Sequence, residues 1–195
     1  MDPTELDAAW RAAWSGCPPV AGRLRAWYPG LAVRFHTLPN AQRYATSASE
    51  RAEILRRHHA LLEMVFEDAE PVWDGLIAVT CSWSDSPVPT PRDDAVASTT
   101  PDAAYWRSEN LATDPDLDSW QHHHISRLPL LGTSLDRLLL CVADDLTDGV
   151  LLTSAACASV YHPYDGGMDV FVPTADARDR LTSTFAAWLP PRARP

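Results

Sequence analysis

Residues 161–169 read YHPYDGGMD and lie between two apolar runs. The glycines Gly166 and Gly167 permit backbone conformations with positive φ, which tight turns require. Two short strands joined by such a turn form a β-hairpin. The stretch therefore predicts an antiparallel hairpin with strands at about residues 158–162 and 168–172.

Outward from this hairpin, strand and helix patterns follow one another along the chain. Residues 32–36 alternate apolar and polar side chains, as a half-buried strand does. Residues 75–83 form a continuous apolar run, which predicts a strand covered on both faces and central in its sheet. The strongest amphipathic helix is expected from Ser49 to about Asp68. Further strands are expected at residues 104–107, 120–126 and 150–153, and further helices at residues 4–15, 20–27, 133–142 and 174–188.

These elements predict a single α+β domain spanning residues 1–195. Its mixed, largely antiparallel sheet is expected to have helices packed mainly on one face. Residues 1–30 would form N-terminal helices. Residues 84–101 carry four prolines among serines and threonines and have no periodicity, which indicates a surface loop within the domain.

Composition bounds the classes of partner. The chain has 26 acidic residues against 16 basic ones, all of them arginine, and a net charge of -10. Such a charge repels phosphate backbones, so we expect no nucleic-acid partner. No run approaches the roughly 20 apolar residues of a membrane span and no signal peptide is recognisable, so we expect no membrane partner and a cytoplasmic location. The four cysteines are far apart in the sequence and form no C-x-x-C pair, so we expect them to be reduced thiols in the core.

Cationic side chains recur around the strand at residues 32–36. Alternation places Arg34 and His36 on one face, and Arg43 with Tyr44 follows the next turn. Arginine suits carboxylate and phosphate groups because its planar guanidinium donates two parallel hydrogen bonds. These cations could therefore pair with acids of the hairpin or with Asp148, bind an anionic ligand, or face water.

The hairpin supplies the opposite charges and a histidine. Asp165 or Asp169 could orient His162 as a general base. Alternatively, the same residues are present only because they stabilise the turn. The candidate ligand-binding residues are Arg34, His36, Arg43, Tyr44, His162, Tyr164, Asp165 and Asp169.

A run of three histidines raises a metal alternative. His122 and His124 would project from one face of a strand, and their spacing would let both imidazoles reach one ion such as zinc. No third ligand is indicated by spacing. We therefore expect no cofactor, with a divalent transition metal at His122 and His124 as the weaker alternative.

Several segments in order resemble one bacterial family, the domain of unknown function 3885. The resemblance extends from about Trp27 to Trp188 and implies a stand-alone bacterial domain whose activity is open. The segments are VRFHTLP at 33–39 with Arg43 and Tyr44, TCSW at 80–83, VADD at 142–145 with GVL at 149–151, and HPYDGG at 162–167 with Asp169 and Val170. Residues 121–125 depart from the more apolar strand expected there.

Two hypotheses for function follow. The first is a non-catalytic binding or interaction protein, for example an immunity-type partner of a toxin, because the chain is small and acidic and has no nucleophile elbow or glycine-rich phosphate loop. The second is a protein or enzyme that holds a small anionic ligand in an Arg/His/Asp site, with or without a metal. No catalytic residue is identified. A concave pocket formed by the candidate residues would favour the second hypothesis, and a flat convex surface would oppose it.

Overall fold

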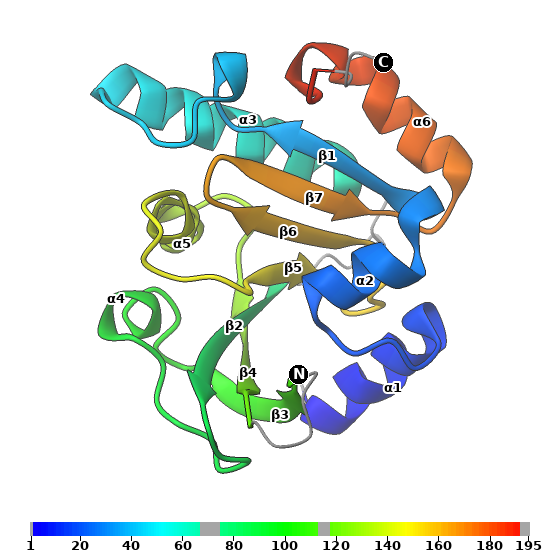
Figure 1. Cartoon of the computed structure of the whole chain (residues 1–195), viewed down its shortest axis with the longest axis vertical. Coiled ribbons are helices and arrows are strands. Elements are labelled where there is room, and N and C mark those ends of the chain that lie inside the picture. Colours follow the sequence, from blue (N-terminus) through cyan, green and yellow to red (C-terminus); the bar gives the residue numbers. More distant parts are fainter. Residues whose placement is uncertain (1, 67–74, 113–117, 192–195) are drawn as a thin grey trace.

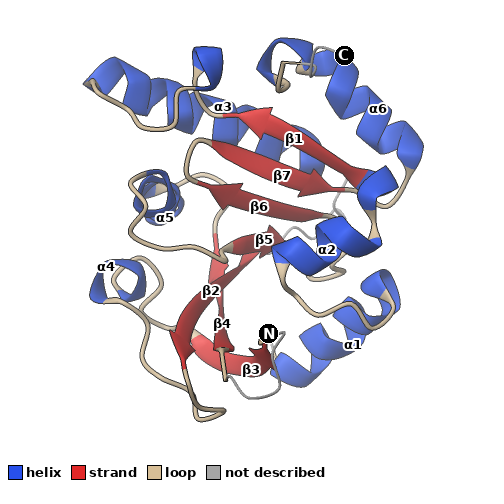
Figure 2. Cartoon of the chain, viewed as in Figure 1, coloured by secondary structure: helices blue, strands red, loops and turns tan. Residues whose placement is uncertain are grey.

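The computed structural model describes residues 2–66, 75–112 and 118–191, which form one seven-stranded sheet with helices on both faces (Figures 1 and 2). Every strand pair is antiparallel, which confirms the α+β prediction. The strands are β1 (Ala32–His36), β2 (Leu76–Ser84), β3 (Ala104–Asn110), β4 (Trp120–Leu128), β5 (Leu151–Thr153), β6 (Val160–Tyr164) and β7 (Gly167–Phe171), in the spatial order β1-β7-β6-β5-β2-β4-β3.

Helices α3 (Ala48–Phe66), α5 (Thr133–Ala143) and α6 (Ala175–Thr184) pack on one face of the sheet, and α1 (Pro3–Trp14) and α2 (Ala21–Trp27) pack on the other. The longest helix thus belongs to the more heavily covered face, as expected, but the second face is also covered. The loop between β2 and β3 contains a one-turn helix, α4 (Asp94–Ala97), and short 3-10 turns lie at Pro29–Leu31, Pro39–Ala41 and Ala186–Trp188.

Strand β2 explains why both faces need cover. It pairs with β5 on one side and β4 on the other, so it is an inner strand, as the apolar run predicted. Leu76 and Ala78 pack under α3 and α5, whereas Ile77 and Val79 pack under α1. Because the residues on both faces of β2 are apolar, a hydrophobic core forms on each face of the sheet.

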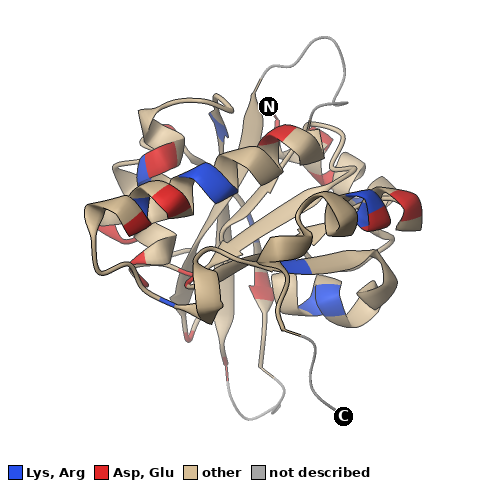
Figure 3. Ribbon diagram, turned by 90° about the horizontal axis from the view of Figure 1, so that it is seen from above, with Lys and Arg blue, Asp and Glu red and all other residues tan. Residues whose placement is uncertain are grey.

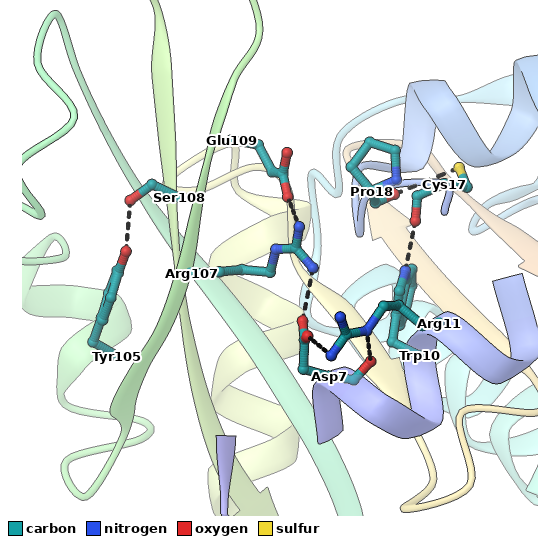
Figure 4. A network of polar contacts seen from close by, with 9 residues as sticks. All are labelled: Asp7, Trp10, Arg11, Cys17, Pro18, Tyr105, Arg107, Ser108 and Glu109. Atoms are coloured by element: carbon teal, nitrogen blue, oxygen red, sulfur yellow. Dashed lines mark hydrogen bonds and ion pairs between the residues drawn. The ribbon is translucent and has the colours of Figure 1, made fainter. Parts of the chain in front are cut away.

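Helix α1 is joined to the edge strand β3 by an ion pair, and one of its buried tryptophans binds the chain segment that follows the helix. Figure 4 shows Arg107 of β3 donating to Asp7 of α1, with an Nη1 to Oδ1 distance of 2.9 Å. The same view shows the buried indole of Trp10 donating to the carbonyl oxygen of Cys17 at 2.7 Å. Because Cys17 lies just beyond the helix, this bond fixes the chain that leads into α2.

The β6–β7 hairpin is present as predicted, and its two glycines serve different purposes. Gly166 occupies the turn with φ +79°, a conformation that side chains disfavour. Gly167 begins β7, and its α-carbon faces the Tyr164 side chain and the carbonyl oxygen of Phe35. A β-carbon at Gly167 would lie 2.6 Å from the Tyr164 hydroxyl and 2.7 Å from that carbonyl oxygen. The second glycine is therefore required by close packing.

Replacing Gly167 by alanine is expected to lower the free energy of unfolding by about 2 kcal/mol, because the backbone of β1 must shift to admit a methyl group. Gly22→Ala is the matched control, since nothing lies within 4 Å of its β-carbon position and it sits inside α2. This control should be neutral or slightly stabilising, gaining well under about 1 kcal/mol, because Gly22 is the second residue of the helix. Urea denaturation monitored by circular dichroism measures both, and equal effects of the two substitutions would contradict the packing argument.

Candidate functional site

Three polar side chains form a row across one edge of the sheet. Arg34 of β1 is the register partner of Asp169 of β7, and Asp169 is in turn the partner of His162 of β6. Their strand neighbours Val33 and Val170 point into the core under α3 and α6. Strand alternation therefore directs the row to the opposite face, where α2 lies.

Asp169 binds two arginines at the base of this row. Arg34 donates through Nε at 2.9 Å and Nη2 at 3.1 Å, and Arg25 of α2 donates through Nε at 2.8 Å. The Asp169 carboxylate is 5% exposed, the lowest value among the carboxylates in ion pairs of the described residues. Burial alone would raise the pKa of Asp169, but the hydrogen bonds from Arg34 and Arg25 hold it below its ordinary value. The carboxylate stays ionised and anchors both guanidinium groups.

A cleft of about 350 Å³ opens over the row. Helix α2 contributes its small residues Ala21 and Gly22 to the wall, and the loop between α5 and β5 contributes Asp145, Thr147 and Asp148. The lining side chains include Arg25, Arg34, Arg43, Asp148, His162 and Tyr164. Seven of the eight candidate residues lie in this cleft or directly beside it.

Tyr164 forms an aromatic part of the lining. The guanidinium carbon of Arg34 lies 5.2 Å from the centre of the Tyr164 ring, and the His162 ring centre lies 5.6 Å from it. Burial raises the pKa of Tyr164 to about 12, so its hydroxyl remains protonated at neutral pH. The ring makes a cation–π contact with the Arg34 guanidinium.

The rim of the cleft ties the hairpin turn to the segment after β1. Arg43 forms an ion pair with Asp165, and the Tyr44 hydroxyl donates to Asp165 at 3.1 Å. The same hydroxyl lies 3.5 Å from a carboxylate oxygen of Asp145, whose backbone has φ +59°. A non-glycine residue in the left-handed region is uncommon and occurs most often in turns and at functional sites.

Six of the eight candidates line the cleft, Tyr44 lies beside it through its contact with Asp165, and His36 lies outside it. His36 faces the same side of the sheet as Arg34, two register pairs nearer the turn, opposite Gly167. Its Nε2 is buried and has no hydrogen-bond partner among the described residues. Its carbonyl oxygen accepts a hydrogen bond from Arg57 of α3 at 3.0 Å.

The expected orientation of His162 requires a correction. Its Nε2 lies 3.8 Å from Asp148, which is in the loop before β5. Asp169 is bound by Arg25 and Arg34 instead, and Asp165 by Arg43. The arginines thus take both carboxylates that the sequence suggested for His162.

Arg25 was missed by the sequence interpretation. It lies four residues after Ala21 and three after Gly22, so all three share one helix face. Two small residues followed by an arginine on one face of a short helix are the available signal, because they leave room for a guanidinium to approach the sheet. Which strand the helix covers depends on tertiary packing.

The histidine run lies in β4 at the other end of the sheet. Both ring nitrogens of His122 are hydrogen-bonded to serine hydroxyls, to Ser84 at 2.8 Å and Ser108 at 2.7 Å. His124 packs against the ring of Tyr105. Among the residues that the structure describes, no group of three or more His, Cys, Asp or Glu side chains is placed to hold a metal ion. The metal alternative stays a prediction that metal analysis of the untagged protein would test.

His123 points to the other face of the sheet. Because this histidine is buried, we expect the stability of the folded protein to depend on pH. Burial lowers the pKa of His123 and of His58 to about 3. Between pH about 6.5 and 3 the unfolded chain therefore binds protons that the folded chain excludes, and stability falls as pH falls, by up to about 1.4 kcal/mol per pH unit for each histidine. Urea denaturation at several pH values between 7 and 4 should show His123→Phe with a shallower slope than the wild type. Parallel slopes would contradict this assignment.

The fold and the cleft define an α+β domain with a carboxylate-anchored pair of arginines beside a hairpin turn. The chain matches the family described as domain of unknown function (DUF3885) over residues 20–193 and belongs to that family. The match confirms the resemblance seen in the sequence. No curated protein and no solved structure matches the chain. Among the described helices, none has both the length and the apolar character needed to cross a membrane.

Proposed function

We propose that this protein binds a small ligand bearing a carboxylate or phosphate group, and that Arg25 and Arg34 hold that group. The observation that carries the proposal is that both guanidinium groups are anchored by one buried carboxylate at the base of a cleft. Each arginine uses Nε and one terminal nitrogen on Asp169, so its other terminal nitrogen remains a potential donor. Two positive charges against one negative charge leave this part of the cleft with an excess of +1.

The surroundings of the arginine pair support binding of a small molecule. A volume of about 350 Å³ lies at the lower end of the range for small-molecule pockets. Elsewhere the arginines and acids are interspersed along the ribbon, as Figure 3 shows. Arg51 of α3, for example, forms an exposed two-bond pair with Asp144, the residue that follows α5. The Asp169 pair differs because its acid is buried and its arginines face a concavity.

The interaction-protein hypothesis stays a second prediction. An acidic side chain or chain terminus of a protein partner would present the same anionic group to Arg25 and Arg34. The immunity-type role would require a stoichiometric partner, which co-purification from the source organism can detect. A partner bound with equal affinity after both arginines are replaced would separate that role from the cleft.

Isothermal titration calorimetry with inorganic phosphate, succinate and hexanoate tests the anion proposal. Wild-type protein should bind at least one of these probes, and Arg34→Gln should weaken that binding by about tenfold or more, because one guanidinium contact to a charged group is lost. Arg51→Gln is the matched control: its side chain is 47% exposed against 45% for Arg34, and it also pairs with an aspartate. Equal loss in both variants, or no binding of any probe to the wild type, would overturn the proposal.

A further inference from the structure

The two walls of the cleft carry opposite charge. Arg25 and Arg34 approach from α2 and β1, whereas Asp145 and Asp148 belong to the loop between α5 and β5. Because Arg43 is paired with Asp165 at the rim, those two charges balance each other. The arginine wall keeps an excess of +1 after Asp169 is counted, and the loop wall carries -2.

Asp148 has unused capacity to bind a cation. Its side chain is 75% exposed, its Oδ1 accepts the N–H of Gly149 at 2.6 Å, and the same oxygen lies 3.8 Å from His162 Nε2. Both of these contacts use Oδ1, and neither uses Oδ2. The pKa of Asp148 is lowered by His162, so the carboxylate is ionised at neutral pH. Its second oxygen is therefore open to a ligand.

The distance between the two charged walls follows from the sheet. Arg34, Asp169 and His162 occupy three adjacent strands, β1, β7 and β6, and Asp148 lies beyond His162. Both guanidinium groups lie on Asp169 of β7, so they are separated from Asp148 by roughly one strand spacing of about 4.8 Å plus the 3.8 Å between His162 and Asp148. A ligand that contacts both walls must carry its two charges several bonds apart.

We propose that the ligand is a zwitterion, with its carboxylate or phosphate on Arg25 and Arg34 and an ammonium group on Asp148. This inference rests on the proposed function and adds the second charge of the ligand. A purely anionic ligand would face the negative charges of Asp145 and Asp148, which disfavour it. A metal ion is a poorer occupant of the loop wall, because no group of three ligating side chains converges there among the described residues.

Matched pairs of probes test the inference by calorimetry. Each pair differs by one ammonium group: glycine and acetate, 4-aminobutyrate and butyrate, 6-aminohexanoate and hexanoate, and 3-aminopropylphosphonate and propylphosphonate. We expect the amino member of at least one of the longer pairs to bind tenfold or more tightly than its partner, and glycine to gain little. The phosphonate pair distinguishes a phosphate from a carboxylate as the anionic group.

Asp148→Asn should abolish the advantage of the amino member while leaving the plain anion at wild-type affinity or better. Asp179→Asn is the control, because Asp179 is 65% exposed, pairs with Arg178 on α6 and lies outside the cleft. If the plain anions bind and no amino member gains, the zwitterion inference is overturned and anion binding stands. If neither the plain anions nor their amino partners bind, the proposed function fails with it.

Discussion

Replacing Asp169 by alanine is expected to lower the free energy of unfolding by about 3 kcal/mol and to abolish anion binding in the cleft. Removal of one member of a buried ion pair typically costs about 3–5 kcal/mol, because the remaining charge is left unpaired. The lower value applies because Arg25 and Arg34 are partly exposed and water can solvate them. Without Asp169 the two guanidinium groups repel each other, so neither keeps its orientation.

The contribution of Asp169 to the free energy of unfolding is expected to depend on pH. Because the folded-state pKa of Asp169 is depressed, its contribution to stability is fully present above the unfolded pKa of about 3.9 and is lost as pH falls through the folded value. The difference between wild type and Asp169→Ala should therefore be constant near pH 7 and shrink in strongly acidic solution. Urea denaturation at pH 7 and at pH 3 measures it.

Asp179→Asn serves as the control for removing an acidic charge, and it should change stability by less than about 1 kcal/mol because its ion pair is exposed. An Asp169→Ala protein as stable as this control would show that Arg25 and Arg34 do not depend on Asp169. A destabilised variant that still bound phosphate or hexanoate with wild-type affinity would separate the anchor from the cleft.

The pairing of the β1 arginine with an acid of the hairpin could be anticipated because both segments show strand alternation and carry opposite charges. Which acid Arg34 meets could not, because the choice between Asp165 and Asp169 depends on the register of β1 on β7. His36 shares the face of Arg34, yet its position two residues further along β1 places it outside the cleft lining. Local sequence patterns thus predict on which face of a strand a side chain lies, whereas the pairing of the strands decides which side chains become neighbours.

The second helical layer was harder to predict for a different reason. Apolar residues occur on both faces of β2, which signals cover on both faces. The sequence does not say which helices provide it, since α1 and α3 are both amphipathic. Arg25 enters the cleft only because α2 packs on the face opposite α3, so its role depends on an arrangement that no local pattern encodes.

Helix α1 precedes residues 20–193, which match the family, and one of its tryptophans is expected to be among the most costly residues to remove. Trp14 is 2% exposed, packs against the rings of Trp10 and Tyr28, and donates its indole N–H to the carbonyl oxygen of Cys157 at 2.8 Å. Trp14→Ala should lower the free energy of unfolding by about 4 kcal/mol, because it leaves a large cavity between α1 and the sheet.

Trp27→Ala is the matched control, since this tryptophan is 54% exposed and its removal should cost well under 1 kcal/mol. Trp14→Phe should fall between the two, because it keeps part of the ring packing and leaves the buried Cys157 carbonyl without its donor. Denaturation monitored by circular dichroism ranks the three variants. If Trp14→Ala were no more costly than Trp27→Ala, α1 would be a dispensable addition to the family domain. A larger loss of stability for Trp14→Ala would instead show that α1 belongs to the hydrophobic core on the face of the sheet where α2, the helix that carries Arg25, also packs.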